Sequence, residues 1–289
     1  MSVAQVPNFG GLRVLTFESR RASELASLIS TYGGKPMLAP ALREVPLESN
    51  TEALEFAAAL VRSEFDITIF LTGVGTRTLA DVVAPQYPRA VFSEALRRTR
   101  VVARGPKPLA ALRELQVPVW ASAPEPNTWR EVIASIDTKF HGPLTGIRVA
   151  VQEYGVANAE LLDALRARGA RVTRVPVYRW ALPENLEPLR HAVSAIAEGR
   201  VDVVLFTTGV QLVHLWQIVQ EMQREQDVRR GLRHAVVVSI GPTTSEELHR
   251  RNLSADLEPS HPKIGVLVRE AAERSGEILQ AKRGHSYRA

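Results

Sequence analysis

The chain repeats itself at a constant distance, and this repeat constrains the fold more strongly than any single motif. Shifting the 289-residue sequence by 136 positions aligns Thr72-Gly73-Val74 with Thr208-Gly209-Val210. The same shift aligns Glu24-Leu25 with Glu160-Leu161, Gly33 with Gly169, Pro40 with Pro176, Asp66 with Asp202, Phe70 with Phe206, Gly105-Pro106 with Gly241-Pro242, and Pro126 with Pro262. Solenoid units are about 20 to 50 residues long, so this period indicates two copies of a domain-sized unit.

Composition excludes several classes of function. With no cysteine and only scattered histidines, the chain offers no disulfide, thiolate nucleophile or cysteine-ligated metal, and we expect no metal. The net charge of +5 favours anionic partners, but no run of five basic residues indicates nucleic acid. No segment approaches the roughly 18 apolar residues of a membrane span, and Met1–Gly11 lacks a secretory signal. We therefore expect a cytoplasmic protein without a membrane partner.

Each copy is expected to begin with a strand and a helix. The apolar runs Arg13–Phe17 and Ile147–Gln152 suit strands. After the first run, apolar residues recur at the spacing of one helix face, and glycine ends the helix in both copies. The residues of that face are Leu25, Leu28, Ile29 and Tyr32. The proline-containing stretches Met37–Pro46 and Val172–Pro183 then suit edge strands or connectors.

The body of each copy alternates short β-rich runs with helical segments. The expected strands are Asp66–Leu71, Arg100–Ala103 and Val117–Ala121 in the first copy, and Asp202–Phe206, Ala235–Ile240 and Ala255–Glu258 in the second. Continuous apolar runs are typical of parallel strands that are covered on both faces. The pattern predicts an α/β fold with doubly wound parallel sheets.

The repeated Thr-Gly-Val elements follow strands, where helix N-termini with unpaired N–H groups can bind anions. Candidate ligand-binding residues here are Thr72, Gly73, Val74, Thr207, Thr208 and Gly209. Ordinary turn and helix-cap chemistry explains the same residues equally simply. Gly105 and Gly241 stand at the next strand ends, accompanied by Arg104 and Lys107 in one copy and by Thr243 and Thr244 in the other. One copy therefore supplies cations and the other supplies hydroxyls.

Three further polar positions lie near strand ends. Tyr154, Gly155 and Asn158 follow the strand that opens the second copy, and Asn158 suits an N-cap as well as a ligand contact. Tyr178 lies in the second connector, where its phenol could pack or donate a proton. No P-loop, complete Gly-x-Gly-x-x-Gly, Gly-x-Ser-x-Gly element or carboxylate pair is present, so a nucleotide site is not indicated.

Over residues 11–280 the chain resembles the uroporphyrinogen-III synthase family. The motifs that carry the resemblance are Phe70-Leu71-Thr72-Gly73-Val74, Val175-Pro176-Val177-Tyr178, Leu205-Phe206-Thr207-Thr208-Gly209-Val210 and Ile240-Gly241-Pro242-Thr243-Thr244. The resemblance implies two flavodoxin-like domains joined by a two-stranded connector, with the opening strand and helix of each copy completing the sheet of the other. Domain one would comprise residues 11–40 and 181–280, domain two residues 41–180, and residues 1–10 and 281–289 would be loose tails.

The resemblance also implies a reaction. A cofactor-free monomer would bind hydroxymethylbilane, a linear tetrapyrrole with eight carboxylates, and close it to uroporphyrinogen III with ring D inverted. Tyr178 would assist departure of the substrate's hydroxyl group. The chain departs from the family pattern at two places. Phe17-Glu18-Ser19 follows Thr16 where the family usually has arginine, and Arg20 and Arg21 come only after it. The Gly-x-x-Thr pattern is met by Gly241 to Thr244 but becomes Gly105-Pro106-Lys107-Pro108 in the first copy.

Two other functions fit the same architecture. A non-catalytic two-lobed protein could close a hinge on a small anion. A regulatory protein could have kept the fold without turnover, and the basic segment Lys282-Arg283-Gly284-His285 is compatible with that role.

Overall fold

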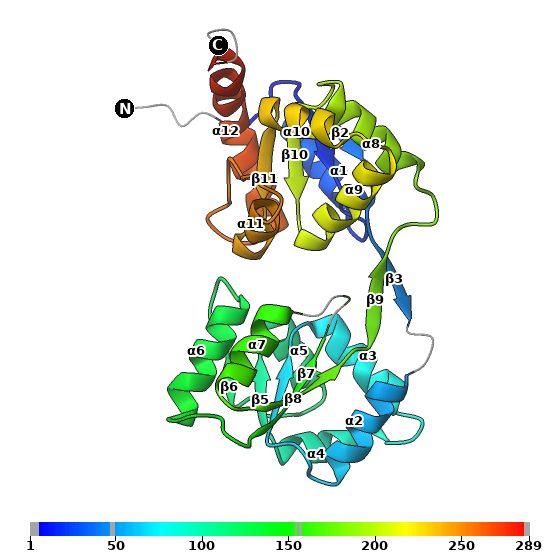
Figure 1. Ribbon diagram of the computed structural model, residues 1–289, viewed down its shortest axis with the longest axis vertical. Coiled ribbons are helices and arrows are strands. Elements are labelled where there is room, and N and C mark those ends of the chain that lie inside the picture. The colour runs from blue at the N-terminus through cyan, green and yellow to red at the C-terminus, as the bar shows by residue number, and fades with distance from the viewer. Residues whose placement is uncertain (1–5, 47–49, 154, 156–157, 286–289) are drawn as a thin grey trace. The chain divides into compact units, whose positions relative to one another are not determined.

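The computed structural model describes residues 6–46, 50–153, 155 and 158–285. Contacts within the chain divide it into two compact units. Unit 1 comprises residues 1–43 and 181–289, and unit 2 comprises residues 44–180. Unit 1 therefore contains the blue and the yellow-to-red segments of Figure 1, whereas unit 2 contains the cyan and most of the green ones. The chain crosses between the units after Arg43 and after Trp180, whereas the family resemblance implied crossings after residues 40 and 180.

The sheet of unit 2 has five parallel strands in the order β6-β5-β4-β7-β8. They are β4 (Ile67–Phe70), β5 (Arg100–Ala103), β6 (Ala121–Ser122), β7 (Arg148–Gln152) and β8 (Arg171–Val175). The strand β7, which opens the second repeat, pairs with β4 from the body of the first, with Phe70 opposite Gln152. All four residues of β4 are buried, as expected of a strand covered on both faces.

Helices cover both faces of this sheet. They are α2 (Thr51–Val61), α3 (Gly73–Val83), α4 (Arg89–Arg97), α5 (Pro106–Glu114), α6 (Trp129–Phe140) and α7 (Ala159–Ala167). Phe70 packs in a hydrophobic core with α2 to α5, whereas its neighbour Ile69 packs in a second core with α6 and α7. Because side chains alternate along a strand, the two cores lie on opposite faces of the sheet.

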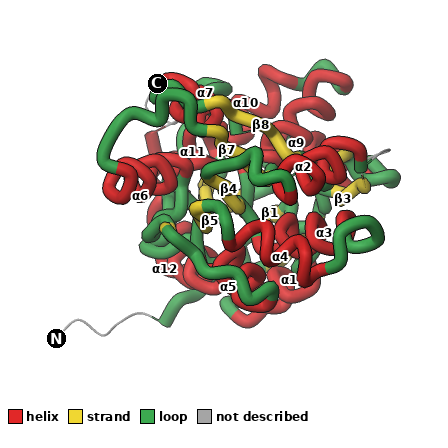
Figure 2. The backbone as a smooth tube through the Cα atoms, turned by 90° about the horizontal axis from the view of Figure 1, so that it is seen from below, coloured by secondary structure: helices red, strands yellow, loops and turns green. Residues whose placement is uncertain are grey.

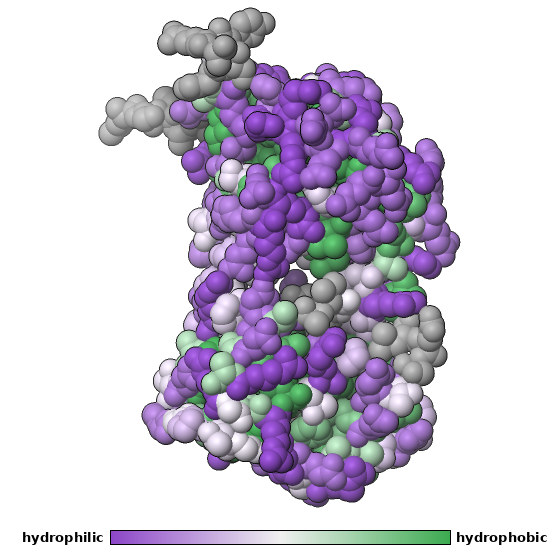
Figure 3. Space-filling view, in the orientation of Figure 1, coloured by the Kyte–Doolittle hydropathy of each residue, from purple (hydrophilic) through white to green (hydrophobic). Residues whose placement is uncertain are grey.

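Unit 1 has the same layered construction. Its parallel sheet has the order β11-β10-β1-β2. The strands are β1 (Arg13–Thr16), β2 (Lys35–Leu38), β10 (Val203–Phe206) and β11 (Val236–Ser239), and the helices are α1 (Ala22–Thr31), α8 (Glu187–Ala197), α9 (Gly209–Glu221), α10 (Glu225–His234), α11 (Pro242–His249) and α12 (Ile264–His285). One core contains Phe206 with α8, α9 and α10, and the other contains Leu205 with α1 and α12. Figure 2 marks the strands in yellow and the helices in red, and Figure 3 shows hydrophilic side chains over most of the visible face of unit 1.

Matching ion pairs anchor the opening strand of each repeat. Nε of Arg13 donates to Asp202 at 2.8 Å, and Nε of Arg148 donates to Asp66 at 3.0 Å. In both pairs the backbone N–H of the arginine donates to the same carboxylate. Each pair joins an opening strand to the body of the other repeat, which is the exchange that the resemblance implies.

Two expected strands are shorter than the sequence suggested. Only Ala121 remains of Val117–Ala121, because Pro118 has no N–H to donate to a ladder. Of Ala255–Glu258 only Leu257 forms a bridge, to Val238. There the side chain of Asp256 accepts the N–H of Val237 at 2.8 Å, in place of a strand carbonyl.

The expectation of loose tails is wrong for the described parts of both ends. Phe9 is buried in the core of unit 1, and its N–H donates to the carbonyl of Tyr32 at 2.7 Å. The helix α12 continues to His285. Within it, Lys282 pairs with Asp256 and Arg283 pairs with Asp202, so these cations anchor the helix.

The connector stretches are extended, as the prolines indicated. The strands β3 (Arg43–Pro46) and β9 (Tyr178–Ala181) form a two-stranded sheet at the points where the chain crosses between the units.

Candidate functional site

The candidate residues lie at the strand-end edge of each unit, which we define as the loops that lead from the carboxyl ends of the parallel strands into helices. Helix N-termini at such an edge present N–H groups that lack partners within the helix.

In unit 2, Thr72 caps the helix α3. Its backbone is extended, and its Oγ1 accepts the N–H of Gly75 at 3.0 Å. The cap chemistry considered from the sequence is therefore present. Val74, one residue into the helix, is 38% exposed.

The structure brings Gly73 against the Gly105–Lys107 loop. A Cβ atom at Gly73 would lie 2.6 Å from the carbonyl oxygen of Lys107, so only glycine permits this approach. The side chain of Lys107 is exposed, and Arg104 is half-buried. The N-termini of α3 and α5 thus lie side by side, and Lys107 belongs to the first turn of α5.

Asn127 supports this loop and was not identified from the sequence. A Cβ atom at Gly105 would lie 2.6 Å from the side-chain amide group of Asn127. With its amide turned so that nitrogen faces acceptors, Asn127 donates to the carbonyls of Ala123 and Arg104 at 3.1 and 3.2 Å. The repeat gives no signal for this contact, because the equivalent residue is Lys263.

The segment after β7 is held by contacts within unit 2. Asn158 caps α7, with its Oδ1 accepting the N–H of Leu161 at 2.9 Å. Gly155 donates its N–H to the carbonyl of Tyr178 at 3.2 Å, and the indole of Trp180 fills the space beside it. Tyr154 lies outside the described residues.

Glu153 and Arg174 form an ion pair that sequence reasoning missed. Glu153 is 3% exposed, and the guanidinium of Arg174 donates to both its carboxylate oxygens at 2.8 and 2.9 Å. The hydrogen bonds that Arg174 donates to Glu153 raise the pKa of Arg174. This carboxylate is therefore already paired.

Tyr178 is buried in the hydrophobic core of unit 2. It is 5% exposed, and its ring meets that of Trp180 edge-on with 5.5 Å between the centroids. This environment accounts for the packing role that the sequence allowed. Proton donation by the phenol stays a prediction.

In unit 1, Thr207 is engaged by two side chains. Its hydroxyl donates to Oε2 of Glu18 at 2.6 Å and accepts from the amide of Gln211 at 2.8 Å. The amide oxygen of Gln211 also accepts the backbone N–H of Thr207 at 2.8 Å. Glu18 had been noted only as a departure from the family pattern, and Gln211 replaces Gly75 in the repeat.

The neighbouring Thr208 is the N-cap residue of α9, but its side chain makes no capping hydrogen bond. It is half-buried, as is Gly209. This hydroxyl and the first-turn N–H groups of α9 lie next to each other at the edge.

The last predicted group is at the start of α11. The N–H of Gly241 donates to Oγ of Ser239 at 3.2 Å, and Thr244 is 2% exposed. Thr243 is exposed and adjoins them. Of the two predicted threonines, Thr243 therefore has the more accessible side chain.

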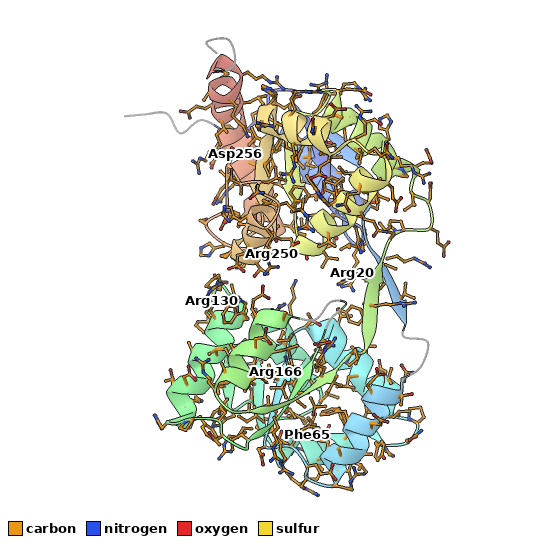
Figure 4. All side chains as sticks on the ribbon, viewed as in Figure 1. Arg20, Phe65, Arg130, Arg166, Arg250 and Asp256 are labelled. Atoms are coloured by element: carbon orange, nitrogen blue, oxygen red, sulfur yellow. The ribbon has the colours of Figure 1, made fainter. Side chains whose placement is uncertain are left out.

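Exposed arginines extend from both edges. Arg20 follows β1 in unit 1, and Arg130 lies in the first turn of α6 in unit 2, with its Cζ 4.6 Å from the ring centroid of Trp129 (Figure 4). Neither was among the predicted site residues. Each adds a cation to the strand-end edge of its own unit.

Among the described residues no group of three or more histidine, cysteine or acidic side chains could hold a metal ion. In the same part of the chain, no helix combines the length and apolar character required to cross a bilayer.

The parallel sheets, the helices on both faces and the strand-end loops define a doubly wound α/β protein whose edges are suited to anionic ligands. The chain belongs to the uroporphyrinogen-III synthase family: the family model described as uroporphyrinogen-III synthase HemD matches residues 23–269.

Curated relatives match over nearly the whole chain. An uncharacterised protein of Bacillus subtilis, YjjA, is 27% identical over 264 residues, covering 91% of this chain and 96% of that protein. A putative uroporphyrinogen-III synthase of Methanothermobacter thermautotrophicus is 26% identical over 266 residues, covering 91% and 98% respectively.

Solved structures share the fold. A mutant uroporphyrinogen III synthase from Thermus thermophilus superposes with a TM-score of 0.71 at 22% identity, covering 93% of this chain and 100% of that one. The wild-type protein in another crystal form gives 0.56 at 23% identity, covering 93% and 99%.

Proposed function

We propose that the protein is a uroporphyrinogen-III synthase that closes hydroxymethylbilane to uroporphyrinogen III with loss of water. Family membership over residues 23–269 is the observation that carries this proposal. We also propose that each unit is flavodoxin-like. When the strands of unit 2 are numbered 1 to 5 in the cyclic order β7, β8, β4, β5, β6, their order across the sheet is 2-1-3-4-5. This is the strand order of flavodoxin.

The main requirement of the reaction is correct positioning of the substrate's rings. Loss of the substrate's hydroxyl group as water leaves an electrophilic azafulvene. Ring D attacks it through its substituted carbon to form a spiro intermediate, which fragments and recloses with ring D inverted. The protein must hold the linear substrate so that this attack is faster than direct closure, which is an effect of orientation. No step requires a cofactor.

The described edges offer suitable groups for a polycarboxylate. Exposed Lys107 and Arg130 lie at the edge of unit 2, and Arg20, Thr208 and Thr243 lie at the edge of unit 1. Helix N-termini add backbone donors at both edges. Charge-assisted hydrogen bonds of this kind hold carboxylates without deep burial of charge.

A coupled assay tests the activity. The purified protein is added to freshly generated hydroxymethylbilane, and the products are oxidised and separated into type I and type III isomers. A synthase yields mainly type III, whereas a hinge-closing binding protein or a regulator without turnover leaves only the spontaneous type I product.

Tyr178 is proposed to assist departure of the hydroxyl group. We expect Tyr178→Phe to lower kcat by up to about tenfold, because a positioned acid contributes only part of the rate when orientation dominates. Tyr178→Phe keeps the ring that packs on Trp180 and therefore isolates the phenol. Unchanged turnover would contradict a role of the phenol in catalysis and would show that Tyr178 serves packing alone.

A further inference from the structure

The hydroxyl of Thr207 has no donor left for a ligand. A threonine hydroxyl carries one hydrogen, and that of Thr207 is directed at Glu18 while Gln211 donates to the oxygen. Gln211 is fully buried, and its carbonyl oxygen is held by the backbone N–H of Thr207. The direction of the Thr207 hydroxyl is therefore determined on both sides.

The other oxygen of Glu18 engages the turn that leads into α1. Its Oε1 accepts the backbone N–H groups of Arg20 and Arg21 at 3.1 and 3.3 Å. One carboxylate thus takes three donors from the two loops that follow β1 and β10. These are donors of the kind that a ligand carboxylate would use.

A resident carboxylate has two effects on an anionic ligand. It occupies the donors, and its charge repels a second carboxylate brought to the same place. Thr208, the next residue, makes no capping hydrogen bond and adjoins the first turn of α9. At the edge of unit 1, a ligand carboxylate can therefore accept a hydrogen bond from the hydroxyl of Thr208 but not from that of Thr207.

We propose that Glu18 is a specificity-determining residue, which closes Thr207 and the turn before α1 to substrate carboxylates and directs them to Thr208. The proposal rests on the proposed function, because it concerns how a polycarboxylate substrate is received. It implies that a ligand carboxylate gains access to Thr207 only when the charge of Glu18 is removed.

The test is a double-mutant cycle on ligand binding by the full-length protein. The probe is uroporphyrin I, a stable octacarboxylate tetrapyrrole, and its fluorescence is titrated against wild type, Glu18→Gln, Thr207→Val and the double variant. Glu273→Gln, an exposed position on α12, is the control for loss of one negative charge. Circular dichroism and thermal unfolding establish that each variant is folded.

We expect Glu18→Gln to tighten binding on the order of fivefold, as removal of one partly solvated like charge allows. Thr207→Val should change the wild-type Kd less than about twofold but should abolish most of the gain in the Glu18→Gln background. Glu18→Ala, which keeps no hydrogen-bonding group, should bind at least as tightly as Glu18→Gln.

Three results overturn the proposal: equal or weaker binding by both Glu18 variants, an equal effect of Thr207→Val in both backgrounds, or no binding by wild type and Glu18 variants alike. A tightening reproduced by Glu273→Gln would also overturn it, because net charge would then explain the effect. Turnover is measured separately. A wild type that makes no type III product but shows the expected cycle would refute the synthase activity and leave the role of Glu18 in place.

Discussion

At the scale of residues, Gly73 and Gly209 occupy equivalent positions in the two repeats but have different neighbours. A Cβ atom at Gly73 would lie 2.6 Å from the backbone oxygen of Lys107, which cannot move independently of α5. At Gly209 the nearest atom is Cβ of Glu247 at 3.2 Å, and the backbone oxygen of Thr243 lies 3.7 Å away. The shared Thr-Gly-Val motif therefore has a stricter steric requirement in unit 2.

We predict that Gly73→Ala lowers the free energy of unfolding by about 1–3 kcal/mol, the usual cost of forcing an atom into a packed site. Gly209→Ala should cost less than about half as much. Urea unfolding followed by circular dichroism measures both. Gly265→Ala is the control: nothing lies within 4 Å of its Cβ position in α12, so alanine should stabilise the helix there. Equal costs for the two repeat positions would contradict the packing argument.

Asp202 makes stability depend on pH. Burial raises its pKa, but hydrogen bonds from the side chain and backbone of Arg13 and from Arg283 outweigh this effect and lower the pKa far below its usual value. A carboxyl group whose pKa is lowered on folding stabilises the protein above the unfolded pKa of about 3.9. That stabilisation is lost as the pH falls through the lower pKa of the folded state.

Asp202→Asn is expected to cost about 2 kcal/mol at pH 7, because it leaves charged donors without a carboxylate. The difference from wild type should shrink as the pH falls below about 4. Asp66→Asn is the matched variant in unit 2. Asp66 has 30% of its side chain exposed against 8% for Asp202, so its loss should cost less. Urea midpoints between pH 3 and 7 give both profiles, and a constant difference for Asp202→Asn would count against the ion-pair account.

At the scale of elements, a glutamine side chain lies at the start of the equivalent helices α9 and α3, but it comes from a different element in each unit. In unit 1 the amide of Gln211, on α9, meets the loop after β10. In unit 2 the equivalent of Gln211 is Gly75, and the amide of Gln152 at the end of β7 occupies the space beside it, where a Cβ atom on Gly75 would overlap it. The equivalent of Gln152 in unit 1 is the smaller Thr16. In both units one of these two equivalent positions thus carries a glutamine and the other a smaller residue, with the positions exchanged.

This exchange predicts non-additive mutations. Gly75→Gln alone should destabilise unit 2 by overpacking, and Gln152→Thr alone should do so by leaving a cavity. The double variant recreates the arrangement of unit 1, so we expect it to recover at least about 1 kcal/mol of the summed single costs. Thermal and urea unfolding of the four proteins complete the cycle. Strict additivity would show that the two side chains do not share the space.

Local sequence patterns predicted individual helices and strands but not the contacts between distant residues. The helix face of Leu25 and Ile29 and the strand before Thr72 were predictable, because periodicity and glycine stops are local signals. The bond between Glu18 and Thr207 was not, since it joins residues 189 positions apart through the pairing of β1 with β10. Asn127 and the pair of Glu153 with Arg174 are likewise products of the folded arrangement.

At the scale of the whole molecule, the repeat and the units do not coincide. A repeat boundary falls near residue 147, whereas unit 2 runs from residue 44 to 180. The strand β7 completes the sheet that β4 begins, and β1 pairs with β10. The sequence repeat alone suggested two consecutive units, and the exchange of opening strands was implied by the family resemblance.

Fragments test this organisation. We predict that residues 44–180 fold alone, because all five strands of their sheet are present. Residues 1–146 should not, since they lack β7 and β8 and would leave one edge of β4 unpaired. Amide dispersion in two-dimensional NMR spectra distinguishes the outcomes. A folded 1–146 fragment would contradict the exchange.

The most direct measurement of the central claim is the ratio of type III to type I product as a function of enzyme concentration. Spontaneous closure competes with the enzyme for one substrate, so a synthase should give a type III fraction that rises with protein concentration and approaches completeness. A fraction that stays at the level without protein, at every concentration, would contradict the assignment of synthase activity.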